Sequence, residues 1–259
     1  MSHTTNTAEI AMYVEASVLA ALSLAYVVWA SWAGGLVETF LGKRKNARMS
    51  YHRFALLAIA FGAMALSLSI FVMTQSEGIT TRRDGVISEY ARQIGLGVAV
   101  ASIVFSFGQY AMFTEASTVV TVTLTLVAFA CATFASLTSA TNLYWVFFAY
   151  WLASVVASAY CTFVGQRIKD VYWYTNLVVW GLVWLHVALY GLWLILSPQV
   201  SDVINRSTEA ILYAVFDCLI FLTAGVGIGV TFTATVPLGA VMAPRNKWNH
   251  MQQRMKQNM

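Results

Sequence analysis

The sequence predicts an all-α membrane protein, built as a single bundle of seven transmembrane helices. Of its 259 residues, 59% are hydrophobic and only 10% are charged, which is more apolar than a soluble globular domain. Apolar runs recur along the whole chain, and each is long enough to cross a hydrocarbon core of about 30 Å as a helix. The short alternating segments typical of a membrane β-barrel are not found.

The seven predicted spans follow one another through short polar links, within one domain covering residues 1–240. The first span is longer than a straight crossing requires, so we expect it to tilt or to begin along the membrane surface. The sixth ends at Ser197-Pro198, because proline cannot continue a helix. Short links favour antiparallel neighbours. The spans are predicted at residues 9–40, 54–74, 86–113, 117–137, 143–164, 171–196 and 208–233, followed by a basic tail at 241–259.

Lysine and arginine are distributed unevenly between the links, and this predicts the orientation. The link 42–53 contains five of them, the link 166–170 two and the tail four, whereas the opposite side has only three. By the positive-inside rule, the N-terminus lies outside and the tail in the cytoplasm. The net charge of +4 is therefore ascribed to orientation and lipid contact, and no nucleic-acid partner is expected.

Few ionisable residues occur inside the predicted spans, and each is a candidate functional residue because charge in a membrane is costly. The third span contains Glu89 and Arg92, the seventh contains Glu209 and Asp217, and the sixth contains His186. Arg92 and Asp217 lie at similar depth and are expected to pair, since leaving either alone in low dielectric costs several kcal/mol. The pair is either structural or responsive to a ligand or ion. Likewise, His186 is either a hydrogen-bonded interior residue or a proton switch.

This arrangement resembles the microbial (type 1) rhodopsins. The matching features are seven spans, an outside N-terminus, the motif Tyr90-Ala91-Arg92, an aspartate eight residues after Glu209 and a sixth span rich in tryptophan. The resemblance implies a rhodopsin-like fold. In that family, a lysine four residues after the seventh-helix aspartate forms the retinal Schiff base, but this sequence has Phe221 there.

Other positions also depart from the family. The resemblance places Gly95 where ion pumps have the carboxylate that accepts the Schiff-base proton. It places Leu96 and Ala99 at positions that usually line the retinal pocket. In the sixth span, one alignment puts Trp193, Tyr190 and His186 along the pocket, and a shifted alignment uses Trp184 instead. The resemblance therefore implies a variant without covalent retinal and without the usual proton acceptor.

Three functions remain open from the sequence. The first is an opsin-like protein without covalent retinal that acts as a regulatory, binding or oligomeric partner, as a homo-oligomer or beside a lysine-bearing rhodopsin. The second is an ion channel or transporter that uses Arg92, Glu89 and Asp217. The third is a photoreceptor that holds retinal or a carotenoid noncovalently. No enzyme motif, metal-ligand spacing or cysteine pairing pattern supports catalysis or a metal site.

Overall fold

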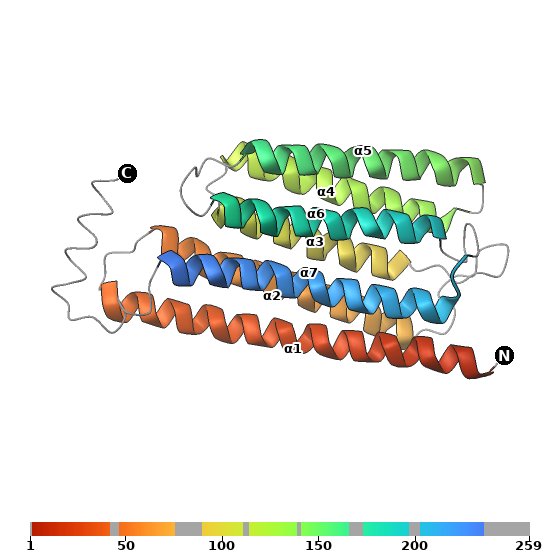
Figure 1. Cartoon of the computed structure of the whole chain (residues 1–259), viewed down its shortest axis with the longest axis horizontal. Helices are drawn as coiled ribbons and strands as arrows, with labels where there is room; N and C mark the ends of the chain where they lie inside the picture. The colour runs from red at the N-terminus through yellow and green to blue at the C-terminus, as the bar shows by residue number, and fades with distance from the viewer. Residues whose placement is uncertain are drawn as a thin grey trace.

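A computed structural model describes residues 2–41, 47–75, 90–110, 114–138, 141–165, 173–196 and 203–235. Its helices lie side by side and run alternately in opposite directions, so α1 begins and α7 ends at opposite ends of the bundle (Figure 1). The helices are α1 (Ser2–Leu41), α2 (Ala47–Gln75), α3 (Tyr90–Tyr110), α4 (Glu115–Leu137), α5 (Thr141–Gly165), α6 (Trp173–Leu196) and α7 (Arg206–Thr235).

Two helices begin well before the start that the sequence patterns predict. The first starts at Ser2, and the second starts at Ala47, inside the stretch expected to be a polar link. Alanine, arginine and methionine all favour helix, and they occur together at Ala47-Arg48-Met49. The basic start of α2 therefore continues as helix beyond its apolar span. The tail predicted at 241–259 and residues 86–89 lie outside the described residues.

The helices close into a ring in which α1 contacts both α2 and α7, and each following helix contacts the next. The third helix is the most enclosed: 72% of its apolar 18-residue stretch is buried inside the bundle. The corresponding share in α5 is only 22%. In Figure 1, α5 and α1 lie at opposite edges of the bundle, with α3 and α7 between them. Side chains of α3 thus provide much of the core, and α5 leaves most of its surface outside.

The described helices have the length and composition of membrane spans. Within the described ranges, six helices are long and apolar enough to cross a bilayer, and α6 adds the apolar stretch Trp180–Leu192. Large apolar side chains cover the outside of the bundle, among them Leu24, Phe61 and Val156, each more than half exposed. Such a surface suits lipid rather than water. The predicted seven-helix membrane bundle is confirmed.

Close helix contact in this bundle depends on small residues and hydroxyl groups. A side chain at Gly225 of α7 would collide with the ring of Tyr26 on α1, and one at Gly97 would meet the Phe129 Cβ atom at 2.7 Å. Between α4 and α5, the hydroxyl oxygens of Thr125 and Ser158 lie 2.7 Å apart. In lipid the hydrophobic effect does not drive helices together, so close packing at small residues and interhelical hydrogen bonds stabilise the bundle instead.

Candidate functional site

The site is built around the guanidinium group of Arg92, which bonds to carboxylates from two other helices. Its Nη1 atom donates to Glu15 Oε1 and to Asp217 Oδ2, both at 2.8 Å. Its Nη2 atom donates to Glu15 Oε2 at 2.9 Å. Arg92 and Glu15 therefore form a bidentate pair with two parallel hydrogen bonds, which is a strong geometry for an arginine and a carboxylate. We call Glu15, Arg92 and Asp217 the charge triad.

The charge triad is sealed from solvent by surrounding side chains. Arg92 and Asp217 are 0% exposed and Glu15 is 1% exposed. The Tyr213 ring lies 4.9 Å from the guanidinium carbon, a cation–π contact, and Tyr190 stacks on Tyr213 with ring centres 5.1 Å apart. In a site so completely buried the ion pairs are strong, and removing Arg92 would leave two carboxylates without a compensating positive charge.

Helix periodicity brings the three residues together. On α1, Glu15 lies on a buried stripe that also contains Met12, Ala16 and Leu19, spaced three and four residues apart. On α7, Asp217 lies on the buried face one turn after Tyr213. Arg92 is the third residue of α3. Since α1, α3 and α7 all begin at the same end of the bundle (Figure 1), the charge triad lies toward that end.

Glu15 is the residue of the candidate site that the sequence patterns did not reveal. Its position near the start of the first predicted span, close to Glu9 and Tyr13, indicates only the outer end of that span. The structure instead places it in the core, bound to the arginine that was expected to pair with Asp217 alone. The sequence does contain one indication: a carboxylate on the apolar face of a membrane helix is a candidate functional residue, because charge in a membrane is costly.

The other predicted polar residues occupy different places. Glu209 is buried in the first turn of α7, where the Asn205 side chain accepts a hydrogen bond from the Thr208 backbone N–H at 2.8 Å. His186 Nδ1 lies 2.6 Å from the Leu182 carbonyl oxygen of its own helix. The imidazole also packs edge-on against the Phe216 ring, with centres 5.7 Å apart. Glu89 lies outside the described residues.

The glycine at the expected acceptor position faces a neighbouring helix. A Cβ atom built on Gly95 would lie 2.5 Å from Ser69 Oγ, 2.6 Å from Ser69 Cβ and 3.3 Å from the backbone Cα of Leu66, all on α2. Such distances are shorter than side chains tolerate without movement. Gly95 therefore serves the close contact of α2 and α3, and a carboxylate there would displace the Ser69 side chain.

The residue at the expected Schiff-base position is part of the apolar core. Phe221 is 0% exposed, and its backbone carbonyl accepts a hydrogen bond from the Tyr26 hydroxyl at 2.7 Å. Its core cluster also contains the predicted pocket residues Leu96, Ala99, Trp184 and Tyr190. Ala99 lies at the contact with α2, where a Cβ on Gly62 would be 3.0 Å from the Ala99 Cα. The side chain of Trp193 lies outside the described residues.

Several buried polar atoms of this core have no hydrogen-bond partner within the described residues. They include the indole nitrogens of Trp180 and Trp184, the hydroxyl of Tyr190 and Oδ1 of Asp217. Buried polar groups usually have a partner, whether protein, water or ligand. The three aromatic groups all belong to α6 and follow one another along its buried face. This row therefore offers buried polar groups to which a water or ligand could hydrogen-bond.

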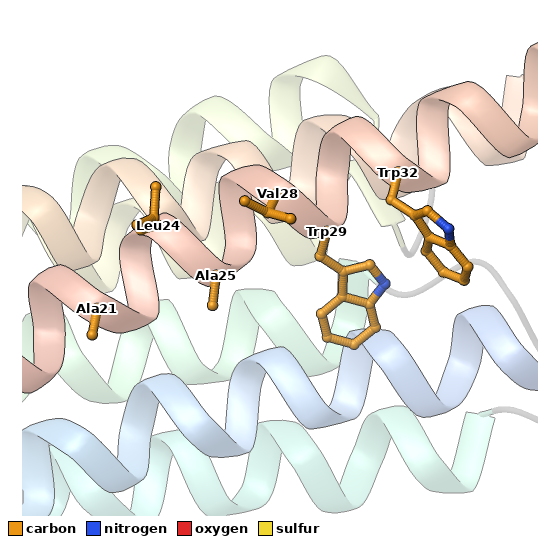
Figure 2. A pocket seen from close by; sticks show the side chains of 6 residues that line it. All are labelled: Ala21, Leu24, Ala25, Val28, Trp29 and Trp32. Atoms are coloured by element: carbon orange, nitrogen blue, oxygen red, sulfur yellow. The ribbon is translucent and has the colours of Figure 1, made fainter.

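An apolar hollow of about 540 Å³ lies on α1, away from the charge triad. Figure 2 shows its lining side chains along α1, with the indole of Trp29 directed toward the α7 ribbon. Leu24, Val28 and Trp32 are more than half exposed, so the hollow opens to the outside of the bundle, where acyl chains fill such surfaces. No group of three His, Cys, Asp or Glu side chains suited to a metal ion occurs in the described part of the chain.

Comparison with known proteins yields structural likeness without sequence likeness. No family model and no curated protein matches the sequence. A cyanorhodopsin from the cyanobacterium Calothrix sp. superimposes with a TM-score of 0.71 at 14% identity, covering 86% of this chain and 94% of that one. A light-driven proton pump from Leptosphaeria maculans gives 0.70 at 17% identity, covering 88% and 96%.

Bromide-bound halorhodopsin from Halobacterium salinarum gives a TM-score of 0.72 at 13% identity, covering 92% of this chain and 98% of that one. The three matches extend over nearly the whole length of each partner. At such low identity they establish architecture and leave activity open. The chain is therefore an integral membrane protein with the seven-helix fold of the microbial rhodopsins.

Proposed function

We propose that this protein is a rhodopsin-like membrane protein that forms no retinal Schiff base and acts as a regulatory, binding or oligomeric partner. The observation that carries the proposal is the complete burial of Phe221, the residue that the sequence resemblance assigns to the position of the family's lysine. Retinal needs an amine for covalent attachment, and the five lysines of the chain all fall outside the described helices. The described helices thus offer no lysine for the covalent attachment on which the family's photochemistry depends.

The outer face of α5 supports a role in association. Val146, Tyr150, Ala153, Tyr160 and Val164 recur at steps of four, three and seven residues on this face, and the two tyrosines are 63% and 67% exposed. Tyr150 is the tenth of 25 residues in α5, near mid-membrane, whereas exposed tyrosines usually lie at the interface. A second copy or a related rhodopsin on this face would supply hydrogen-bond partners and a small-residue contact at Ala153.

Cysteine crosslinking tests this association. With Cys131, Cys161 and Cys218 changed to alanine, Ala153→Cys is expected to give disulfide-linked dimers in native-like membranes under mild oxidation. Leu24→Cys, exposed on the opposite edge of the bundle, is the matched control and should remain monomeric. Equal crosslinking at both positions, or none at position 153 together with a monomer in lipid nanodiscs, would refute self-association through α5.

Ion transport is a second candidate function, favoured by the buried charge triad. A guanidinium held between two carboxylates near one end of the bundle offers a polar step that an ion or proton could use. Expressed in a cell or reconstituted in liposomes, the protein should then carry a current or an ion flux that falls at least tenfold in Asp217→Asn. If neither the wild type nor Asp217→Asn carries a current or an ion flux, this counts against transport and favours the partner role.

Noncovalent binding of retinal or a carotenoid is a third candidate, favoured by the polar atoms of Trp184 and Tyr190 that lack partners within the described residues. A cavity for such a pigment would have to form between α6 and the Phe221 side chain. Pigment that co-purifies, resists hydroxylamine and is extracted intact by organic solvent would support this function. A Phe221→Lys variant that becomes coloured would show that the space persists.

A further inference from the structure

The charge triad contains two acids and one base. With all three groups ionised, Glu15, Arg92 and Asp217 would leave one net negative charge in a site that is at most 1% exposed. An uncompensated charge costs several kcal/mol in such a place, and a buried group loses its charge by taking up a proton instead. We propose that the charge triad binds one exchangeable proton, held between the carboxyl groups of Glu15 and Asp217.

The geometry favours sharing of this proton between the two acids. Glu15 Oε1 and Asp217 Oδ2 both lie 2.8 Å from the same Nη1 atom of Arg92, so the two carboxyl groups are close neighbours. Like charges so close cannot both stay ionised in low dielectric. Asp217 Oδ1 is buried and has no hydrogen-bond partner among the described residues, which leaves one carboxyl oxygen open to carry the proton.

A proton fits this site better than a metal cation. Both oxygens of Glu15 and one of Asp217 already accept hydrogen bonds from Arg92, whereas a hard cation needs about six oxygen ligands. Binding forms one O–H bond on a carboxyl oxygen with a proton from water, and release returns that proton to water. Arg92 keeps its charge throughout, because guanidinium does not deprotonate in proteins.

Among the described residues, the neighbouring titratable groups do not supply the missing positive charge. Tyr213 and Cys218 on α7, and Tyr190 on α6, are neutral at pH 7. Glu209, two turns before Asp217 on the same face, adds negative charge when ionised. From α2, Ser67 donates its hydroxyl to the Ala16 carbonyl. His186 contacts Leu182 and Phe216, and as the one histidine of the described core it requires its own control.

Infrared spectroscopy of the purified protein in lipid nanodiscs tests the proposal. At pH 7 the protein should show a carboxylic-acid C=O band that shifts in D₂O. Glu15→Gln and Asp217→Asn should each abolish it, because either change leaves Arg92 with a single carboxylate. Glu115→Gln, an exposed acid at the start of α4, and His186→Gln should both retain the band. Its persistence in Glu15→Gln, or its loss in His186→Gln, would overturn the proposal.

Stability against pH gives a second readout that does not depend on assigning a band. Above about pH 5 the carboxyls of the unfolded chain are ionised, so the native state would bind one proton more than the unfolded state. The unfolding equilibrium constant should then rise tenfold for each pH unit until the native site releases its proton. Glu15→Gln and Asp217→Asn should flatten this slope. An equal slope in all three proteins would contradict the proposal, which stands apart from any retinal or partner role.

Discussion

Replacing Arg92 with glutamine is expected to destabilise the bundle more than any other single exchange of a charged residue. The change leaves Glu15 and Asp217 buried side by side without their shared donor. Breaking a buried ion pair by removing one partner costs about 3–5 kcal/mol. Thermal or denaturant unfolding in a mild detergent should show this loss, together with a lower yield of folded protein.

Two further variants separate lost charge pairing from general damage. Arg53→Gln removes an exposed cation near the start of α2 and should change stability by less than about 0.5 kcal/mol. Combining Arg92→Gln with Glu15→Gln and Asp217→Asn removes all three charges and should recover much of the loss, since neutral replacements of whole buried ionic sets are often tolerated. Wild-type stability of Arg92→Gln alone would show that the charge triad does not hold the helices.

Introducing an acid at Gly95, to restore the carboxylate typical of ion pumps, is expected to unfold the protein rather than activate it. The new side chain would press on Ser69 and on the backbone of Leu66. Overpacking costs about 1–3 kcal/mol, and an unpaired charge at the contact of α2 and α3 adds several more. Unfolding curves of Gly95→Asp in detergent, with light-driven pH changes in vesicles, measure both consequences.

Alanine substitutions provide the matched comparison for this steric claim. Gly95→Ala adds one methyl group at the tight contact and should destabilise the protein by about 1–3 kcal/mol. Gly181 lies on the exposed face of α6, with nothing within 4 Å of an added Cβ. Gly181→Ala should therefore be neutral or raise stability by up to about 1 kcal/mol, through helix propensity alone. Equal effects at both positions would refute the account of Gly95.

Much of the fold could be predicted from the sequence because the membrane restricts the options. Long uncharged runs can only be spans, and their number and short links leave a seven-helix bundle. Arg92 and Asp217 could be placed at similar depth by counting turns along α3 and α7. Counting turns does not give the rotation of α1 about its axis, however, so the inward direction of Glu15 emerged only from packing.

The candidate site shows what a family pattern leaves undetermined. The resemblance assigns Gly95 to a proton-acceptor position, but the surroundings of a residue depend on which helix lies against it, here α2 through Ser69. Phe221 follows Asp217 by one helical turn, and its burial depends on partners from other helices such as Tyr26. Contacts between residues 195 positions apart leave no local pattern in a single sequence.

Covalent attachment of retinal is the point on which the account depends most. Cells supplied with all-trans retinal should yield a protein without a red-shifted visible band that hydroxylamine bleaches. Borohydride reduction, which would trap any Schiff base as a stable amine, should leave the intact mass of the purified protein unchanged. A hydroxylamine-sensitive band together with a retinyl adduct on any of the five lysines would contradict the account.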